Sequence, residues 1–234
     1  MRRIFALLAA ASATLLLTGC GGSGNGILNI PNPRVRFVNA FPDVATAKAQ
    51  VGSDVVTSGV ALGSVSDYIV TDNGNKNFTA GQSTFSDLAT LANELYETQK
   101  RYTGIGWGQT TRAILLLEED KSQATNNTIS LRTVNVGEGL GAVDVYVQDS
   151  TGSGTLPVSP SFANVAEGAT STRADVSSPG AFSARVRVYA AGQTTTALLD
   201  NTVLLDSRER ASLVVIKDPN ATGGLRLLVL REDI

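Results

Sequence analysis

The chain after residue 33 alternates short apolar runs with clusters of turn-forming residues, a pattern that predicts β-strands. Runs rich in Val, Thr, Tyr and Leu are separated by Gly, Asn, Asp, Pro and Ser; examples are residues 34–40, 143–147, 185–190 and 211–217. Within 143–147 (Val-Asp-Val-Tyr-Val) polar and apolar residues alternate, as expected for a strand with one buried face. Strands separated by turns at intervals of about 8–12 residues predict an all-β sandwich or barrel.

One stretch of this region, residues 84–99, fits two secondary structures. Its apolar side chains recur with helical spacing, at Phe85, Leu88, Leu91, Ala92 and Leu95. A helix, and a strand with a turn, are therefore both open, because periodicity alone does not separate them in a short apolar run. We favour the strand and turn, because the segment lies within a β-rich repeat.

The second half of the chain repeats the first. An offset of 96 residues sets four positions on their counterparts without a gap: Arg36 on Arg132, Val38 on Val134, Asn39 on Asn135 and Val51 on Val147. At an offset of 113, residues 114–120 fall on residues 227–233, so both copies begin and end with matching strands. A repeat of this length is a domain rather than a solenoid unit. The expected fold is all-β, with two tandem antiparallel β-sandwich (Ig-like) domains at 34–124 and 129–234 around a polar seam at 121–127.

The first twenty residues have the organisation of an export signal. Arg2 and Arg3 precede an apolar run at residues 4–17, about the length of a signal-peptide core and shorter than the roughly 20 residues that span a bilayer. The run ends in Leu-Thr-Gly-Cys20, which resembles the lipobox of bacterial lipoproteins. The resemblance implies that residues 1–19 are removed and that the Cys20 thiol carries a diacylglyceryl group. An ordinary cleaved signal with an incidental cysteine, and a twin-arginine signal, are the alternatives.

Cys20 is the only cysteine of the chain, so it has no disulfide partner within it. Lipidation explains an odd cysteine in an exported protein, and two or more acyl chains give a stable anchor. Residues 20–33, first Gly-rich and then Pro-rich, predict a flexible tether that ends in an extended segment. Gly21 in place of an aspartate favours the outer membrane, if the source is Gram-negative. The expected partner is therefore a membrane, reached through the lipid anchor.

The charge balance and the residue types exclude several functions. Of the 19 Lys and Arg residues, Arg2 and Arg3 leave with the signal peptide, so 17 stand against 21 Asp and Glu, a net charge of −4. This balance gives no electrostatic basis for nucleic-acid binding. The absence of His excludes a Ser-His-Asp triad, a Cys-His pair and His-based zinc sites. Carboxylates, Lys, Tyr and hydroxyls remain as possible catalytic groups, and we expect no enzymatic activity, no cofactor and no metal.

Short motifs in both copies resemble the bacterial domain-of-unknown-function family 4397. Residues 38–43 (Val-Asn-Ala-Phe-Pro-Asp) resemble its opening motif, and residues 142–146 (Ala-Val-Asp-Val-Tyr) resemble the strand that follows it. The later motifs of the family have counterparts that resemble them at residues 63–68, Tyr102-Thr103 and Pro179-Gly180. Copy two lacks the Pro-Asp turn, and copy one has Lys48 where the family has Asp. The resemblance implies a β-rich domain, often in tandem, in secreted or surface-anchored proteins without an assigned activity.

Three polar motifs have a structural interpretation beside a functional one. Residues 39–43 can end a strand in a turn, because Asn and Asp bond nearby backbone groups and Pro presets φ; ligand binding is the alternative. Residues 137–142 (Gly-Glu-Gly-Leu-Gly-Ala) begin like a dinucleotide fingerprint, but a strand follows where that fingerprint requires a helix. Residues 71–75 could offer oxygens to calcium, but they lack the EF-hand spacing, and their Asn-Gly pair favours a hairpin turn.

Two further groups of residues define the functional alternatives. Tyr102 and Trp107 lie among glycines and could form a sugar-stacking platform, although a Trp in a sandwich is more often core. Residues 118–120 (Glu-Glu-Asp) could suggest glycosidase chemistry, which needs two carboxylates about 5–10 Å apart, although a charged run at a strand end is usually solvated. We favour a lipid-anchored cell-envelope protein with a non-catalytic structural or binding role. A module that binds envelope polysaccharide, a small ligand or a protein, and a carboxylate-based hydrolase, are the alternatives.

Overall fold

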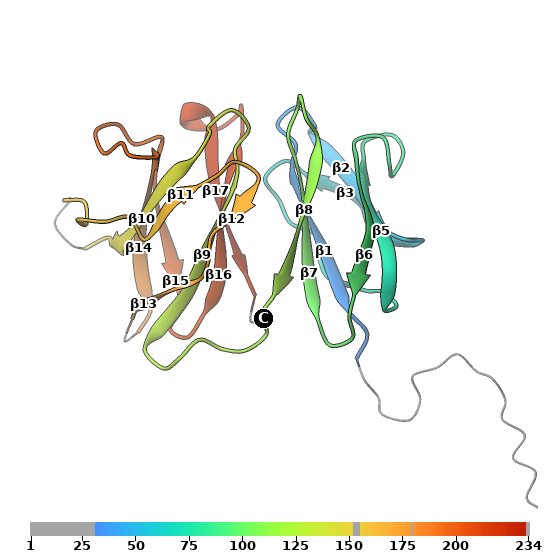
Figure 1. Cartoon of the computed structure of the whole chain (residues 1–234), viewed down its shortest axis with the longest axis horizontal. Coiled ribbons are helices and arrows are strands. Elements are labelled where there is room, and N and C mark those ends of the chain that lie inside the picture. The colour runs from blue at the N-terminus through green and yellow to red at the C-terminus, as the bar shows by residue number, and fades with distance from the viewer. Residues whose placement is uncertain (1–30, 152–154, 179, 233–234) are drawn as a thin grey trace, which may run out of the picture. The chain divides into compact units, whose positions relative to one another are not determined.

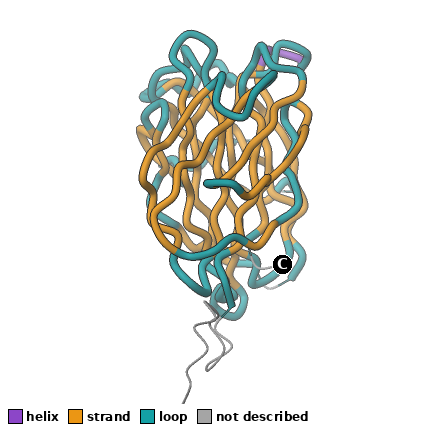
Figure 2. Tube along the Cα trace, turned by 90° about the vertical axis from the view of Figure 1, so that its right-hand side faces the viewer, coloured by secondary structure: helices purple, strands orange, loops and turns teal. Residues whose placement is uncertain are grey.

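The computed structural model describes residues 31–151, 155–178 and 180–232, and the regular secondary structure of these residues is almost entirely β-strand. Figure 1 shows the strands in two halves, residues 34–119 and 128–231. Figure 2 shows helix in one short segment, the 3-10 helix η1 (Thr222–Gly224). The predicted all-β fold class is confirmed. The described residues from Pro31 onward form one compact unit.

The first half is a sandwich of two four-stranded sheets. Its strands are β1 (Arg34–Ala40), β2 (Thr46–Val51), β3 (Asp54–Ala61), β4 (Ile69–Val70), β5 (Gly74–Gly81), β6 (Ala89–Tyr96), β7 (Arg101–Trp107) and β8 (Ala113–Glu119). One sheet has the order β4-β1-β7-β8 and the other the order β3-β2-β5-β6. Side chains from both sheets form one hydrophobic cluster between them.

The second half is built in the same way. Its strands are β9 (Thr128–Val136), β10 (Val143–Asp149), β11 (Phe162–Val165), β12 (Ala169–Thr170), β13 (Ala174–Ser177), β14 (Phe182–Ala190), β15 (Leu199–Leu205), β16 (Arg210–Lys217) and β17 (Leu225–Arg231). One sheet has the order β12-β9-β16-β17, with β13 also paired to β9, and the other has the order β11-β10-β14-β15. The four strands predicted from the clearest apolar runs correspond to β1, β10, β14 and β16.

The segment at residues 84–99 contains strand β6, so the interpretation as a strand and turn is confirmed. Its helical spacing has a local cause. The pairing of β6 with β5 shifts between Lys76↔Glu94 and Phe78↔Leu91, and Asn93 at this shift has a φ of 60°. The extra residue of such a bulge breaks the alternation of inward and outward side chains.

Most strand pairs are antiparallel, as the sequence predicts, and each half adds one parallel pair that the pattern does not indicate. In the first half β1 runs parallel to β7, from Arg34↔Arg101 to Ala40↔Trp107. In the second half β9 runs parallel to β16. A parallel pair requires a long crossover connection. Here the intervening strands of each half supply that connection.

A third hydrophobic cluster lies between the halves and explains the continuous apolar runs of the central strands. In β16, Leu213 and Val215 belong to the core of the second half. Val214 and Ile216 belong to the cluster that also contains Val38 of the first half. A strand that is buried on both faces loses the usual alternation of polar and apolar residues. We call this third cluster the junction.

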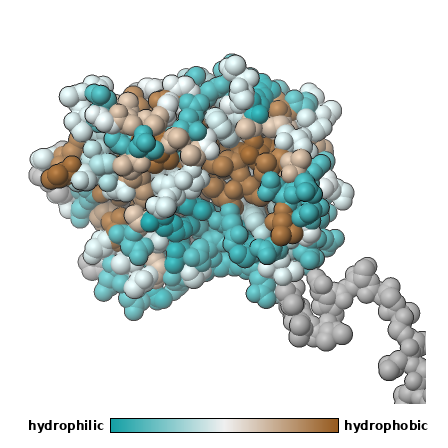
Figure 3. Space-filling view, in the orientation of Figure 1, coloured by the Kyte–Doolittle hydropathy of each residue, from teal (hydrophilic) through white to brown (hydrophobic). Residues whose placement is uncertain are grey.

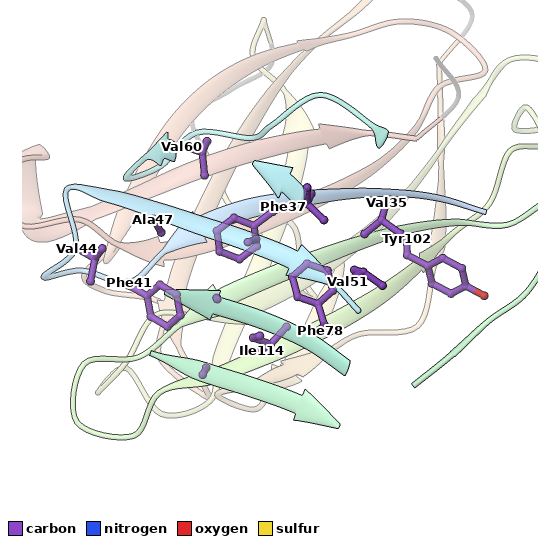
Figure 4. Packing of buried hydrophobic residues seen from close by; sticks show 14 of the residues in the cluster. Val35, Phe37, Phe41, Val44, Ala47, Val51, Val60, Phe78, Tyr102 and Ile114 are labelled. Atoms are coloured by element: carbon purple, nitrogen blue, oxygen red, sulfur yellow. The ribbon is translucent and has the colours of Figure 1, made fainter. Parts of the chain in front are cut away.

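Aromatic rings fill the core of the first half (Figure 4). The ring centroids of Phe37 and Phe78 lie 6.0 Å apart. A Cβ at Gly104 of β7 would lie 2.4 Å from Cζ of Phe78. Glycine at this position therefore allows the opposite sheet to place a phenyl ring directly against the β7 backbone.

The expected signal peptide, Cys20 and most of the tether lie outside the described residues. Within the described ranges, no helix is long and apolar enough to cross a membrane. The boundaries of two independent domains, 34–124 and 129–234, stay a prediction. The predicted polar seam at 121–127 forms the loop between β8 and β9.

Candidate functional site: two buried carboxylates at the junction

The first half places a buried carboxylate, Glu119, at the edge of the junction. Glu119 ends strand β8 and is 3% exposed. Its Oε1 accepts hydrogen bonds from Arg36 (Nη2, 2.8 Å) and from the hydroxyl of Thr103. Its Oε2 accepts a hydrogen bond from the hydroxyl of Tyr68. Because Arg36 is itself 6% exposed, this is a buried ion pair with added hydroxyl donors.

The second half places Glu232 in the same kind of environment. Its Oε1 accepts hydrogen bonds from Arg132 (Nη2, 3.0 Å) and from the hydroxyl of Ser212 (2.7 Å). Its Oε2 accepts a hydrogen bond from Nη2 of Arg173. Glu232 is completely buried and ion-paired to both arginines. A carboxylate in such a site is stabilised only while its charge partners are present.

The two networks are connected across the junction in a reciprocal manner. Nη2 of Arg36 also donates to the backbone carbonyl of Arg231, at 2.9 Å. Nη2 of Arg132 donates to the backbone carbonyl of Glu118, at 3.0 Å. Each arginine therefore neutralises the carboxylate of its own half and bonds the backbone just before the carboxylate of the other half. Such a reciprocal pattern is characteristic of an isologous interface.

The apolar contacts of the junction follow the same reciprocity. The buried members from the first half are Val38, Ala40, Ile105 and Leu117, and those from the second half are Val134, Val136, Val214, Ile216 and Leu230. Val38 and Val134 are 96 positions apart, and Leu117 and Leu230 are 113 positions apart, the two offsets found in the sequence.

The networks differ in charge at one position, where Tyr68 in the first half and Arg173 in the second donate to the other carboxylate oxygen. The guanidinium of Arg36 lies 4.6 Å from the ring centroid of Tyr68. Burial, followed by the negative charge of Glu119, raises the pKa of the Tyr68 hydroxyl far above its usual value, which keeps it a donor. Burial lowers the pKa of Arg173, and the nearby Arg132 adds to this effect, although Glu232 opposes it.

The predicted turn at residues 39–43 is present and has a structural role. Nδ2 of Asn39 donates to the carbonyls of Val44 (2.9 Å) and Val60 (3.1 Å), and its Oδ1 accepts from the backbone of Phe41. In the second half, Asn135 bonds Gly141, Val165 and Gly137 in the same way. The side chain of each asparagine is completely buried and occupied by backbone groups.

The aromatic residues proposed for sugar stacking are part of the packing. Tyr102 is 4% exposed, its ring packs edge-on against Tyr96 at 5.0 Å, and its hydroxyl accepts from the backbone of Glu97. Trp107 is half-buried and packs against the junction. A Cβ at Gly168 would lie 2.8 Å from Cζ2 of Trp107, so the indole lies against the second half. The geometry of Tyr102 and Trp107 therefore favours packing over a sugar platform.

The carboxylates at residues 118–120 are engaged by cations. Glu118 pairs with Lys100, Glu119 with Arg36 and Asp120 with Arg210. Burial acts to raise the pKa of Asp120, but hydrogen bonds from Ser122 and the charge of Arg210 bring it below its usual value. A general acid requires a raised carboxyl pKa, so this arrangement does not favour glycosidase chemistry.

The remaining motifs are connections. Residues 137–142 join β9 to β10 as expected, and Glu138 accepts hydrogen bonds from the backbone of Gln109 (2.7 Å) and Thr110 (2.8 Å) in the first half. Residues 71–73 join β4 of one sheet to β5 of the other, and β5 begins at Gly74, so the interpretation of Asn-Gly as a hairpin turn is wrong. Among the described residues, no group of three or more Asp, Glu, Cys or His side chains could hold a metal ion.

The junction networks were not identified from the sequence as sites, although the sequence contains a signal for them. The offset of 96 sets Arg36 on Arg132, and the offset of 113 sets Glu119 on Glu232. Charged residues that recur at both ends of a repeat, each within an apolar strand, indicate buried ion pairs. Cys20, the predicted lipidation site, lies outside the described residues.

Comparison with known proteins identifies one family. Residues 33–146 match the family described as "Domain of unknown function (DUF4397)". The match covers the whole first half and ends within β10 of the second. No curated protein matches the chain. The resemblance predicted from the short motifs is confirmed over this range, and residues 33–146 contain a DUF4397-like domain.

Proposed function

We propose that this chain is a lipoprotein of the bacterial cell envelope, held on a membrane by acyl chains on Cys20, with a non-catalytic structural or binding role. The observation that carries the proposal is the lipobox-like Leu-Thr-Gly-Cys20 at the end of an apolar run, in a chain with no other cysteine. The folded unit begins at Pro31, so residues 20–30 are available as a tether.

The geometry of the polar groups supports a role without catalysis. The two buried carboxylates at the junction, Glu119 and Glu232, are neutralised by arginines. These groups hold strands together, and burial separates them from solvent. We also propose that the two halves are copies of one domain, because equivalent hydrogen bonds recur in both, around Arg36 and Arg132, Asn39 and Asn135, and Glu119 and Glu232.

The test is metabolic labelling with a fatty acid analogue in a bacterial host, followed by membrane fractionation. The full chain should incorporate label and sediment with membranes. Cys20→Ser should carry no label and should be soluble or uncleaved, while the control Ser23→Ala should behave as the full chain does. Absence of label from the full chain, or equal label on Cys20→Ser, would overturn the proposal.

A further inference from the structure

A small basic hollow lies where the chain enters the folded unit. It has a volume of about 200 Å³ and is lined by Pro31, Asn32, Arg34, Lys100, Arg101 and Lys121. Four of these six residues are cations, and none is a carboxylate. They come from the start of β1, the start of β7 and the loop after β8. In the view of Figure 3, hydrophilic side chains cover much of the lower part of the molecule.

The cations of the hollow are only partly neutralised by the protein. Lys100 pairs with Glu118, and Nη1 of Arg101 donates to the backbone carbonyl of Glu232. Among the described residues, neither Arg34 nor Lys121 forms an ion pair with a carboxylate, and both are exposed. Burial, and then the positive charges of Arg101, Arg34 and Lys100, lower the pKa of Lys121. The hollow therefore has a positive potential that an anion would relieve.

The neighbouring carboxylates do not cancel this potential. An adjacent hollow contains Glu118, Glu119 and Asp120 together with Lys100 and Lys121. Each of these three carboxylates already has a cationic partner, namely Lys100, Arg36 and Arg210 respectively. The two cations that remain, Arg34 and Lys121, are both in the basic hollow.

The place of the hollow in the chain identifies the anion. Pro31 lines the hollow, and Cys20 precedes it by 11 residues. An extended chain of this length spans at most about 40 Å, so the hollow is within reach of the surface of any membrane that holds Cys20. Anionic lipids attract Lys and Arg near the surface by about 1 kcal/mol for each cation.

We propose that the basic hollow binds the phosphate of anionic phospholipid headgroups in the membrane to which Cys20 anchors the chain. The binding would set the orientation of the folded unit, with the start of β1 toward the lipid. This inference rests on the proposed lipid anchor for its biological setting. Its test uses a chain without acyl groups, so that the two proposals can fail separately.

The experiment measures binding of residues 20–234 with Cys20→Ser to vesicles. This chain keeps the whole compact unit from Pro31 onward. It should sediment with vesicles that contain phosphatidylglycerol and should not sediment with phosphatidylcholine alone. The variant Arg34→Gln/Lys121→Gln should lower the partition coefficient about 25-fold, from about 1 kcal/mol for each cation. The control Lys48→Gln/Lys217→Gln changes the net charge equally outside the hollow and should lower it less than about threefold.

The outcomes separate the hollow from general electrostatics. Unchanged circular dichroism and melting temperature of both variants would show that folding is not the cause. No binding to phosphatidylglycerol vesicles, or an equal loss in the control variant, would overturn the proposal. Titration with inorganic phosphate provides the remaining arm: saturable binding at the hollow without any preference for anionic vesicles would assign the site to free phosphate and would also overturn it.

Discussion

Glu119 and Glu232 hold corresponding places in the two halves, yet different side chains neutralise them. Glu119 faces one arginine, Arg36, with a tyrosine hydroxyl on its second oxygen. Glu232 faces two arginines, Arg132 and Arg173. The first network is balanced, whereas the second contains two positive charges for one carboxylate.

The comparison shows that one architecture tolerates two charge arrangements, with different consequences for a single substitution. Leaving a buried charge without its partner lowers the free energy of unfolding by several kcal/mol. Removing a hydrogen bond that carries no such charge lowers it by less. Loss of Glu232 would leave two guanidinium groups together in a buried site. Loss of Glu119 would leave one, which keeps its bond to the backbone of Arg231.

The largest effect on the free energy of unfolding is expected when the second half is removed. A fragment of residues 31–124 would expose Val38, Ile105 and Leu117, which the second half covers. We expect its free energy of unfolding to fall by on the order of 5 kcal/mol relative to residues 20–234, given about 1.5–3 kcal/mol for each large apolar side chain. At high concentration the fragment should dimerise through this face.

Urea titration followed by the fluorescence of Trp107, with sedimentation velocity, measures both quantities. Trp107 is the only tryptophan and lies in the first half against the junction, so its fluorescence reports the first half together with its contact to the second. A fragment that is monomeric and as stable as the full chain would show that the junction contributes little and that each half folds independently.

The next largest effect is expected when either buried carboxylate is neutralised, and the loss of stability should differ between the two. Glu232→Gln should lower the free energy of unfolding by about 4 kcal/mol, within the range for a broken buried ion pair. Glu119→Gln should cost roughly 2–3 kcal/mol, because only Arg36 is left without its charge partner. Chemical denaturation at neutral pH compares the two variants directly, and a larger cost for Glu119→Gln would contradict the charge argument.

A smaller effect is expected for the tyrosine that distinguishes the first network. Tyr68→Phe removes a hydroxyl that donates to Glu119 and should cost about 1–2 kcal/mol. The matched control is Tyr96→Phe, because the buried Tyr96 hydroxyl has no hydrogen-bond partner among the described residues. The control should change stability at neutral pH by less than about 0.5 kcal/mol, and equal losses in the two variants would exclude a role for the bond.

Tyr68 also predicts a dependence on pH. Its pKa is raised in the folded chain by burial and by Glu119, from an ordinary value of 10.0. Above about pH 10 the unfolded chain loses this proton while the folded chain keeps it, so stability falls as the pH rises. Thermal melts across pH 8–11, a range set by the usual tyrosine pKa of about 10, should show a shallower fall in Tyr68→Phe, and an unchanged slope would contradict the assignment.

The smallest effect is expected away from the junction. Arg185 and Asp200 form a bidentate pair in the second half, with distances of 2.8 and 2.5 Å, but both side chains are about one-third exposed. Solvent screens such a pair, so Arg185→Gln should change the free energy of unfolding by less than about 1 kcal/mol. A loss similar to that of Glu232→Gln would show that burial is not what separates the two classes of ion pair.

Local patterns were sufficient to predict much of the fold. The strands at 34–40, 143–147, 185–190 and 211–217 form because their Val, Leu and Tyr side chains fit a pleated, buried surface. The asparagine turns were also predictable, because a short amide side chain bonds the backbone near it in sequence. The hairpin predicted from Asn-Gly at 73–74 is wrong, because the turn preference of these residues does not specify whether the next strand joins the same sheet.

The amino-acid sequence by itself determined the β character of the chain and the places of several strands, the two offsets of the repeat and the exclusion of His-based chemistry. These properties depend on residues that are near one another along the chain or on composition alone. Only the tertiary structure decided that Tyr102 is core, that Glu119 and Glu232 are buried, and that Arg34 and Lys121 share one hollow. The partners in these contacts are brought together from distant positions by sheet pairing and by the packing of one half on the other, and the burial that sets their energies exists only after that packing.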